Sequence, residues 1–370
     1  MRTWSAADPS RLKSATSLKV YLHLHAGQGP RRVAHLLKTL ALAGAFLYLL
    51  VPLTSAGSAR FGFPVIRGPY LGERAPRDRA ELFSPGVIST RNHEYSPLAI
   101  RADGREMFWV VVTFDSANRV LERRVWHTRE AEGIWSEPAP FEALPAGAHC
   151  PVLSPNGKEL YFLSGEPDST ATDKPAPSQP WVMRASGDLW TGIAPAPNLL
   201  PRFRNRGTMS FSFASNGNLY FDLGGPDEGG TWRFRIYCSE MRNGVRREPR
   251  LLGDGINDGS INASPCISPD ESYLIFGSNR DGGQRDLYIS FRTRGGRWTA
   301  PVNMGPRVNT SSDEWHPSIS ADGRYLFFSR FNDRTLQDYY WIDARIVQDL
   351  RLECALNEPK RGRPDSHRKG

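Results

Sequence analysis

One phrase recurs five times along the chain and constrains its fold more than any other feature. Each copy has an apolar stretch, a turn of Asp or Asn followed in most copies by Gly, and a second apolar stretch. The turns lie at Asp103-Gly104, Asn156-Gly157, Asn216-Gly217, Asp270-Glu271 and Asp322-Gly323. Asp-Gly and Asn-Gly accept the positive φ angles of tight hairpin turns, and the flanking residues alternate as they do in strands. The phrase predicts five β-hairpins, and Glu271, which stands where Gly is expected, predicts a different or strained fourth turn.

A third apolar stretch follows every hairpin, and a fourth follows a phrase that runs from Trp to Pro. The third stretch is clear at 285–293, and the Trp-to-Pro phrase is clear at 135–138 and 298–301. Proline suits the start of an outer edge strand, where its missing N–H is not needed. Consecutive turns lie 52 to 60 residues apart. Four strands at this interval are typical of a propeller blade, which buries its faces against its neighbours.

The count of outer strands predicts how the ring closes. Fourth strands are expected at only four places, near 139–143, 196–200, 249–252 and 300–304. The segment 79–90 has the pattern of 299–310, so a strand at about 80–84 should complete the last unit. We therefore predict an all-β chain that forms a β-propeller of five four-stranded blades closed by an N-terminal strand. The alternative is six blades, if residues 60–78 contribute strands. Apolar spacing after residue 345 predicts a short amphipathic helix or a final extension.

The N-terminal region is typical of an export signal. Arg31, Arg32 and Lys38 precede an apolar run at 39–53, and small residues follow as far as Ala59. This run has the length of a signal peptide and is short for a bilayer span. We expect export to the periplasm or cell surface, with an uncleaved inner-membrane anchor as the alternative. The predicted parts are 1–59 as export signal or membrane anchor, 60–78 as N-terminal lead-in, 79–352 as propeller and 353–370 as a basic, polar and disordered tail.

The charge and the cysteines exclude some classes of function. The formal charge is +8, of which residues 1–40 contribute +6 and residues 358–370 contribute +3, so the part between them carries −1. Because a nucleic-acid-binding domain should itself be basic, we expect no nucleic-acid partner. The four cysteines are far apart and show no metal-ligand spacing, and we expect no metal and no cofactor. Buried free thiols are favoured, although export would permit disulfides; the four are Cys150, Cys238, Cys266 and Cys354.

These motifs resemble the WD40-like β-propeller repeats of TolB-type periplasmic proteins. The resemblance is carried by "SPCISPDESYLIFGSNRDGGQRDLYIS" at 264–290, by "HPSISADGRYLFFSR" at 316–330 and by the phrase at 296–320. The opening at 68–97 is similar to the start of an exported, uncharacterised branch of that family. The resemblance spans residues 68–352 and implies the propeller fold. TolB acts as an interaction platform in the cell envelope, so it also implies a binding role, although one fold serves many functions.

The candidate ligand-binding residues stand just before the inner strands, where the mouth of the channel is expected. They are His93, Glu94, His149, Asp313, Glu314 and His316. Glu94 and Glu314 share one repeat position. Carboxylates and imidazoles around a mouth suit a cation, a sugar or a basic peptide. The alternative is that these groups cap strand ends and hydrogen-bond between blades.

We expect a monomeric, non-catalytic cell-envelope propeller that binds an envelope protein, peptide or glycan at one rim of the ring. The alternative is a glycan-acting hydrolase, sialidase-like or another glycosidase, in which the acidic residues near the mouth supply the necessary pair of carboxyl groups. One degenerate Asp-box phrase, "GPDEGGTW" at 225–232, is the only sialidase-like motif. The chain has no G-x-S-x-G, P-loop, HExxH or dinucleotide motif. An uncut leader would add N-terminal membrane association.

Overall fold

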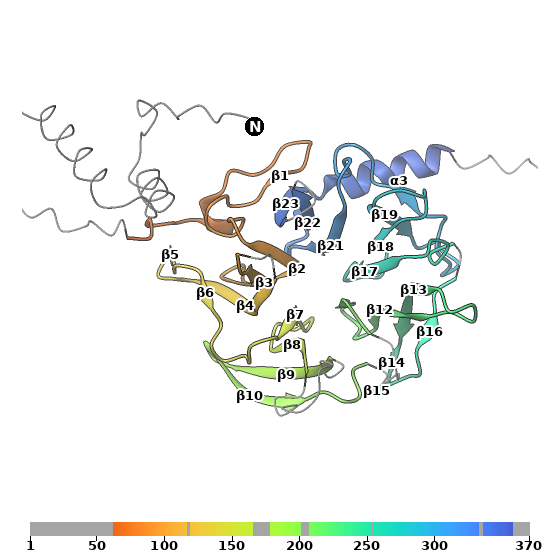
Figure 1. The fold of residues 1–370 in the computed structure, drawn as a ribbon. Coiled ribbons are helices and arrows are strands. Elements are labelled where there is room, and N and C mark those ends of the chain that lie inside the picture. The colour runs from red at the N-terminus through yellow and green to blue at the C-terminus, as the bar shows by residue number, and fades with distance from the viewer. Residues whose placement is uncertain are drawn as a thin grey trace, which may run out of the picture. The chain divides into compact units, whose positions relative to one another are not determined.

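Five antiparallel sheets surround a central channel in the computed structural model of the chain (Figure 1). The structure describes residues 62–116, 119–165, 178–200, 207–253, 255–332 and 336–357. The five-bladed prediction is confirmed. The six-bladed alternative is wrong, because residues 62–78 contain only one 3₁₀ turn, η2 (Pro69–Gly72), and no strand.

The blades repeat one antiparallel order, counted from the inner strand beside the channel to the outer edge. Blade 1 contains β2 (His93–Ile100), β3 (Glu106–Phe114), β4 (Val120–Ala131) and β6 (Ala139–Pro140), with β5 (Ile134–Trp135) pairing antiparallel with the end of β4. Blade 2 contains β7 (His149–Leu153), β8 (Glu159–Ser164), β9 (Gln179–Ser186) and β10 (Leu189–Pro195). Blade 3 contains β11 (Phe211–Phe213), β12 (Leu219–Pro226), β13 (Trp232–Ser239) and β16 (Arg250–Leu251), beside the small hairpin of β14 (Met241–Arg242) and β15 (Val245–Arg246). Blade 4 contains β17 (Asn262–Ile267), β18 (Tyr273–Ser278), β19 (Asp286–Phe291) and β20 (Val302–Asn303). Blade 5 contains β21 (Glu314–Ile319), β22 (Tyr325–Asn332), β23 (Leu336–Asp343) and β1 (Glu81–Leu82).

The N-terminal strand closes the ring as predicted. In the β1–β23 ladder, Glu81 lies opposite Trp341. The backbone N–H of Phe83 donates to Tyr339 O at 2.8 Å. The ring of Phe83 is fully buried, with its centroid 5.0 Å from those of Phe327 and Trp341. The two ends of the propeller are therefore joined by both backbone pairing and aromatic packing.

Two boundaries differ from those predicted. The outer strand of blade 2 is β10, earlier than the predicted 196–200, because the strand that follows the turn at Gly187 continues past an irregularity between Thr191 and Ala194 and forms the outer edge itself. Leu189 then pairs directly with Ser186. The helix predicted after residue 345 is present as α3 (Arg345–Asn357) and continues past 352, where the propeller was expected to end.

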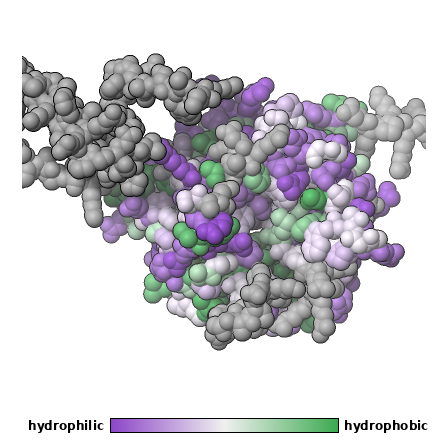
Figure 2. All heavy atoms as spheres, viewed as in Figure 1, coloured by the Kyte–Doolittle hydropathy of each residue, from purple (hydrophilic) through white to green (hydrophobic). Residues whose placement is uncertain are grey.

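The core consists of layers between neighbouring blades. Each second strand carries at least one aromatic side chain that is at most 1% exposed; these include Trp109, Phe162, Phe221, Phe276 and Phe328. All four cysteines are free thiols, and three of them are buried. The visible surface mixes hydrophilic and hydrophobic side chains rather than gathering the apolar ones (Figure 2). Burial between blades is thus the main source of stability.

The hairpin turns lie together at one end of the ring, which we call the hairpin face. Their glycines have φ between 66° and 84°, and Glu271 takes the same left-handed conformation with φ 56°. The predicted strain is therefore present. It is offset by the Glu271 carboxylate, which accepts hydrogen bonds from Asn216, Asn218 and Tyr220 of blade 3 and pairs with Arg292 at 3.1 Å.

The inner strands bend at one shared level. In four blades a residue with positive φ directly precedes a proline, and the register with the second strand shifts there. These residues are Ser96, Cys150, Ser264 and His316. Such bulges bend a strand and increase its twist. With Ser210, their counterpart in blade 3, they are at most 4% exposed, so the channel is filled at this level.

Blade 3 uses a buried carboxylate in place of the bulge. Asp222 is fully buried and accepts backbone N–H bonds from Met209 at 2.6 Å and from Ser264 of the next blade at 2.8 Å. Burial raises the pKa of this carboxyl to about 7, although the backbone donors oppose the rise. Asp222 therefore joins blades 3 and 4 at the level of the bulges.

The predicted export signal or anchor falls within residues 1–61, outside the described residues. Within the described residues, no helix is long and apolar enough to cross a bilayer.

Candidate functional site

The six predicted residues lie at the face where the inner strands begin, which we call the loop face. His93 and Glu94 begin β2, His149 begins β7, and Glu314 and His316 lie in β21. Blade geometry therefore brings them to one end of the ring, as predicted. Their accessibility differs, however, because Glu94, Glu314 and His316 are buried while the other three are partly exposed.

Glu314 is held inside blade 5. Its Oε1 accepts the Thr310 hydroxyl at 2.7 Å and pairs with Arg330 Nε at 2.8 Å. The residue is 0% exposed. Burial raises the pKa of Glu314, while Thr310 and Arg330 oppose the rise. These contacts fix the loop before β21, and no path to solvent leads to this carboxyl group.

Glu94 is the repeat counterpart of Glu314 but lacks the arginine. Its Oε1 accepts the Thr90 hydroxyl, whereas Oε2 is buried without a hydrogen-bond partner. Val111 stands opposite Glu94 in the ladder, where Arg330 stands opposite Glu314. Burial raises the pKa of Glu94 to about 7, and the charge of Asp338 contributes in the same direction. A protonated carboxyl group suits this environment.

His93 and His316 are built into contacts between strands and blades, whereas His149 Nδ1 lies 3.1 Å from Gly147 O of its own loop. His93 Nδ1 accepts Gln337 N at 3.2 Å, and His316 Nδ1 lies 3.1 Å from Ser329 Oγ. Burial lowers the pKa of His316 to about 3, and the charges of His93 and Arg285 add to this. Burial also lowers the pKa of His149 to about 4. His149 and His316 are therefore neutral at physiological pH.

Asp313 is the predicted residue that lines an open groove. The groove lies between blades 4 and 5 and has a volume of about 720 Å³. The Asp313 carboxylate forms an ion pair with Arg285, whose guanidinium lies 4.0 Å from the centroid of the Trp315 ring. Both charges are thus already paired within the described residues.

A second hollow lies on the hairpin face, where no functional residue was predicted. We call it the throat. It has a volume of about 180 Å³ and is lined by the second halves of all five inner strands. Its inner ring is Pro97, Pro151, Phe211, Pro265 and Pro317, and its outer ring is Ile100, Leu153, Phe213, Ile267 and Ile319. The throat ends at the buried bulge residues and is therefore blind.

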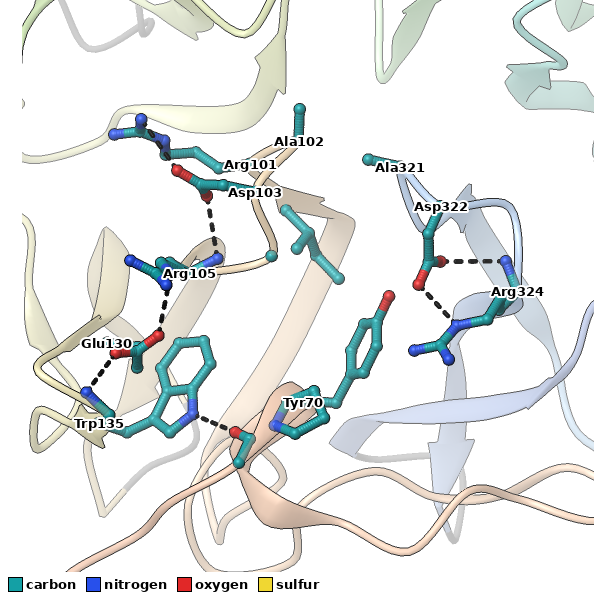
Figure 3. A pocket seen from close by; sticks show the side chains of 15 residues that line it. Tyr70, Arg101, Ala102, Asp103, Arg105, Glu130, Trp135, Ala321, Asp322 and Arg324 are labelled. Carbon is teal, nitrogen blue, oxygen red and sulfur yellow. Dashed lines mark hydrogen bonds and ion pairs between the residues drawn. The ribbon is translucent and has the colours of Figure 1, made fainter.

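The throat adjoins a pocket at the junction of blades 1 and 5, which we call the side pocket (Figure 3). Ile100 and Ala321 line both spaces. The side pocket has a volume of about 470 Å³. Three ion pairs lie along its walls, Arg101 with Asp103 at 3.2 Å, Arg105 with Glu130 at 3.2 Å and Arg324 with Asp322 at 2.7 Å.

The lead-in before β1 forms one wall of the side pocket. Tyr70 and Leu71 have positive φ angles of 50° and 60°. In Figure 3 the Tyr70 ring projects between the walls toward Asp322, and the Trp135 indole donates to Gly68 O at 2.8 Å. Two consecutive left-handed residues are costly and persist only where the surrounding packing holds them. The predicted lead-in is therefore an ordered part of this pocket.

Sequence reasoning missed the hairpin face because its wall residues look like core residues. The available signal was the recurrence of proline followed by aliphatic residues on the inner strands, which places apolar side chains around an axis. Within the described residues, no group of three His, Cys, Asp or Glu could hold a metal ion.

No family model matches the chain, and no curated protein matches it in sequence. Solved structures that are similar to the chain include TolB from Acinetobacter baumannii, with 19% sequence identity and a TM-score of 0.39. The matched region covers 69% of this chain and 55% of that one. An endo-arabinase from Bacteroides thetaiotaomicron has 14% identity and a TM-score of 0.46, with 70% and 95% covered. A Trypanosoma rangeli sialidase bound to the inhibitor DANA has 13% identity and a TM-score of 0.36, with 71% and 57% covered. The chain thus spans little more than half the length of that TolB.

Proposed function

We propose that the chain is an exported, non-catalytic β-propeller of the WD40-like, TolB-type group that binds a protein, peptide or glycan on one face of its ring. The binding face in this proposal is the hairpin face. The observation that carries it is the pair of neighbouring hollows on that face, the throat lined by all five blades and the side pocket that shares Ile100 and Ala321 with it. Ligand sites are concave, with largely apolar walls and a few convergent polar groups.

The carboxyl groups support binding more than hydrolysis. Glycoside hydrolysis needs a proton-donating carboxyl group and a second carboxylate, both in contact with the sugar. Glu94 and Glu314 are closed to solvent. Burial alone would raise the pKa of Asp322 in the side pocket, but hydrogen bonds from Ser320, Arg324 and Tyr70 outweigh it and lower the pKa. A carboxyl group with a lowered pKa is a poor general acid.

The test compares the full exported chain with two variants at exposed alanines. Ala321→Trp places an indole where the throat meets the side pocket, and Ala143→Trp places one on the loop between blades 1 and 2. Each protein is incubated with a cell-envelope extract, and bound protein, peptide and glycan are identified by mass spectrometry. Loss of a specific ligand in Ala321→Trp alone supports the proposal. Release of soluble sugar from the extract by the wild type would overturn it in favour of the hydrolase.

Export belongs to the proposal and has its own test. N-terminal sequencing of the mature chain should find a start at Arg60, after the expected cleavage site at Ala59. A chain that retains its N-terminus in the membrane fraction would contradict cleavage and favour the anchor.

A further inference from the structure

The chemistry of the throat restricts what can enter it. Four of the five residues in its inner ring are prolines, which have no N–H to donate, and its outer ring is entirely aliphatic or aromatic. The Ser212 hydroxyl in the wall already accepts Ile267 N at 3.0 Å. Ser318 Oγ is a single wall hydroxyl without a hydrogen-bond partner. A hydroxyl-rich sugar ring would lose its hydration here without replacement, which is costly.

The size of the throat matches one side chain. Its volume is about 180 Å³, and apolar protein cavities of roughly 150 Å³ take up benzene. An aromatic or large aliphatic side chain therefore fits, and the buried Ser318 hydroxyl presents no accessible oxygen to it. The throat opens only toward the hairpin face, so a side chain that enters it belongs to a segment lying on that face, next to the side pocket.

The side pocket supplies charges of both signs next to the throat. The side chains of Asp103, Asp322 and Arg324 are 40% to 58% exposed, so their outer atoms remain available to a ligand. The three arginine side chains and the three carboxylates of these ion pairs give the side pocket no net charge. A polyanion gains little from such a lining, whereas a segment with charges of both signs can meet each of them.

We infer that the ligand of the hairpin face is a polypeptide segment that inserts one large apolar side chain into the throat and places neighbouring acidic and basic side chains over the side pocket. This inference rests on the proposed function and narrows its ligand from three classes to one. The apolar side chain is the anchor, and the charged neighbours set the direction of the segment.

The experiment uses a phage-displayed library of 12-residue peptides selected on the full exported chain. We expect enriched peptides to share one Phe, Trp, Leu or Ile flanked within a few residues by acidic and basic residues. A synthetic peptide of the enriched sequence is then titrated by calorimetry. Replacing its apolar residue by alanine should weaken binding at least tenfold. Enrichment of peptides without the apolar residue, or no enrichment, would overturn the inference.

Variants locate the site and separate the inference from the proposed function. Ala321→Trp and Ala102→Trp, on opposite walls of the entrance, should each weaken the peptide at least tenfold, while Ala143→Trp should leave its affinity unchanged. The melting temperature of each variant checks its folding. If the peptide binds Ala321→Trp and Ala102→Trp as well as wild type, the inference fails. If an oligosaccharide array binds wild type but not Ala321→Trp, the proposed function stands and the peptide inference fails.

Discussion

The buried carboxyl group of Glu94 should make the stability of the propeller depend on pH. Its pKa is about 7 in the folded chain, against an ordinary value of 4.5, because burial disfavours the charged form. The folded state thus holds this proton more tightly than the unfolded state. The stabilisation is complete below pH 4.5 and is lost as the pH rises to 7. At about 1.4 kcal/mol per pH unit, the loss amounts to about 3 kcal/mol.

Glu94→Gln removes the charge and keeps an oxygen that can accept the Thr90 hydroxyl. Its free energy of unfolding, relative to wild type, should rise by up to about 3 kcal/mol between pH 5 and pH 8. Urea unfolding at pH 5, 6, 7 and 8, followed by tryptophan fluorescence, measures this difference. A difference that changes by less than about 0.5 kcal/mol across the series would refute the reasoning, because the carboxyl group would then ionise as it does in water.

The repeat counterpart provides the control. The pKa of Glu314 is also raised to about 7, but Glu314→Gln leaves Arg330, whose side chain is 12% exposed, without its anionic partner. At pH 8 this variant should therefore be less stable than Glu94→Gln by about 3 kcal/mol. An equal gain at pH 8 in both variants would mean that the arginine does not stabilise the charged form of Glu314. The two variants together test the role of the cation that one blade has and the other lacks.

Three further substitutions test the joints of the ring by chemical unfolding. Phe83→Ala should cost about 3 to 5 kcal/mol because it opens a cavity at the closing seam, while Val65→Ala in the exposed lead-in should cost little; equal effects would contradict the seam. Glu271→Ala should be less stable than Glu271→Gly by about 1 kcal/mol, since both lose the contacts to blade 3 and only glycine accepts the left-handed φ; no difference would contradict the strained turn. Asp222→Asn should lower the free energy of unfolding by about 1 to 3 kcal/mol, because the amide nitrogen must face one of the backbone N–H groups that now donate to the carboxylate. An unchanged unfolding midpoint would contradict the hydrogen bonds from Met209 N and Ser264 N.

The repeat was sufficient to predict the architecture of the ring. Turn residues and strand alternation are local signals, and counting outer strands placed β1 in the last blade. The outer strand of blade 2 was placed too late because the strand after the Gly187 turn continues into the outer strand past an irregularity between Thr191 and Ala194. The turn itself has counterparts at Gly133 and Gly244, so the difference lies in how the chain continues after it, which composition does not reveal.

The candidate site could be predicted only in part. The repeat position of Glu94 and Glu314 correctly placed both at the start of an inner strand. The surroundings of Glu94 are set by Thr90 and by Val111 on the neighbouring strand. Those of Glu314 are set by Thr310 and by Arg330 on the neighbouring strand. The throat was missed because its apolar walls carry no polar motif. Only the closed ring turns these residues toward a shared space.

The seam between β1 and β23 also determines when this protein can become native. β1 is made first among the strands, and its partner is made last. A nascent or translocating chain must therefore carry an unpaired edge and the bare apolar flank of blade 1 until residue 343 has emerged. Pairings so distant in sequence form slowly and leave intermediates prone to aggregation. A chain that ends before β23 cannot pair β1, so its ring stays open and its unpaired edges remain available for pairing with another chain.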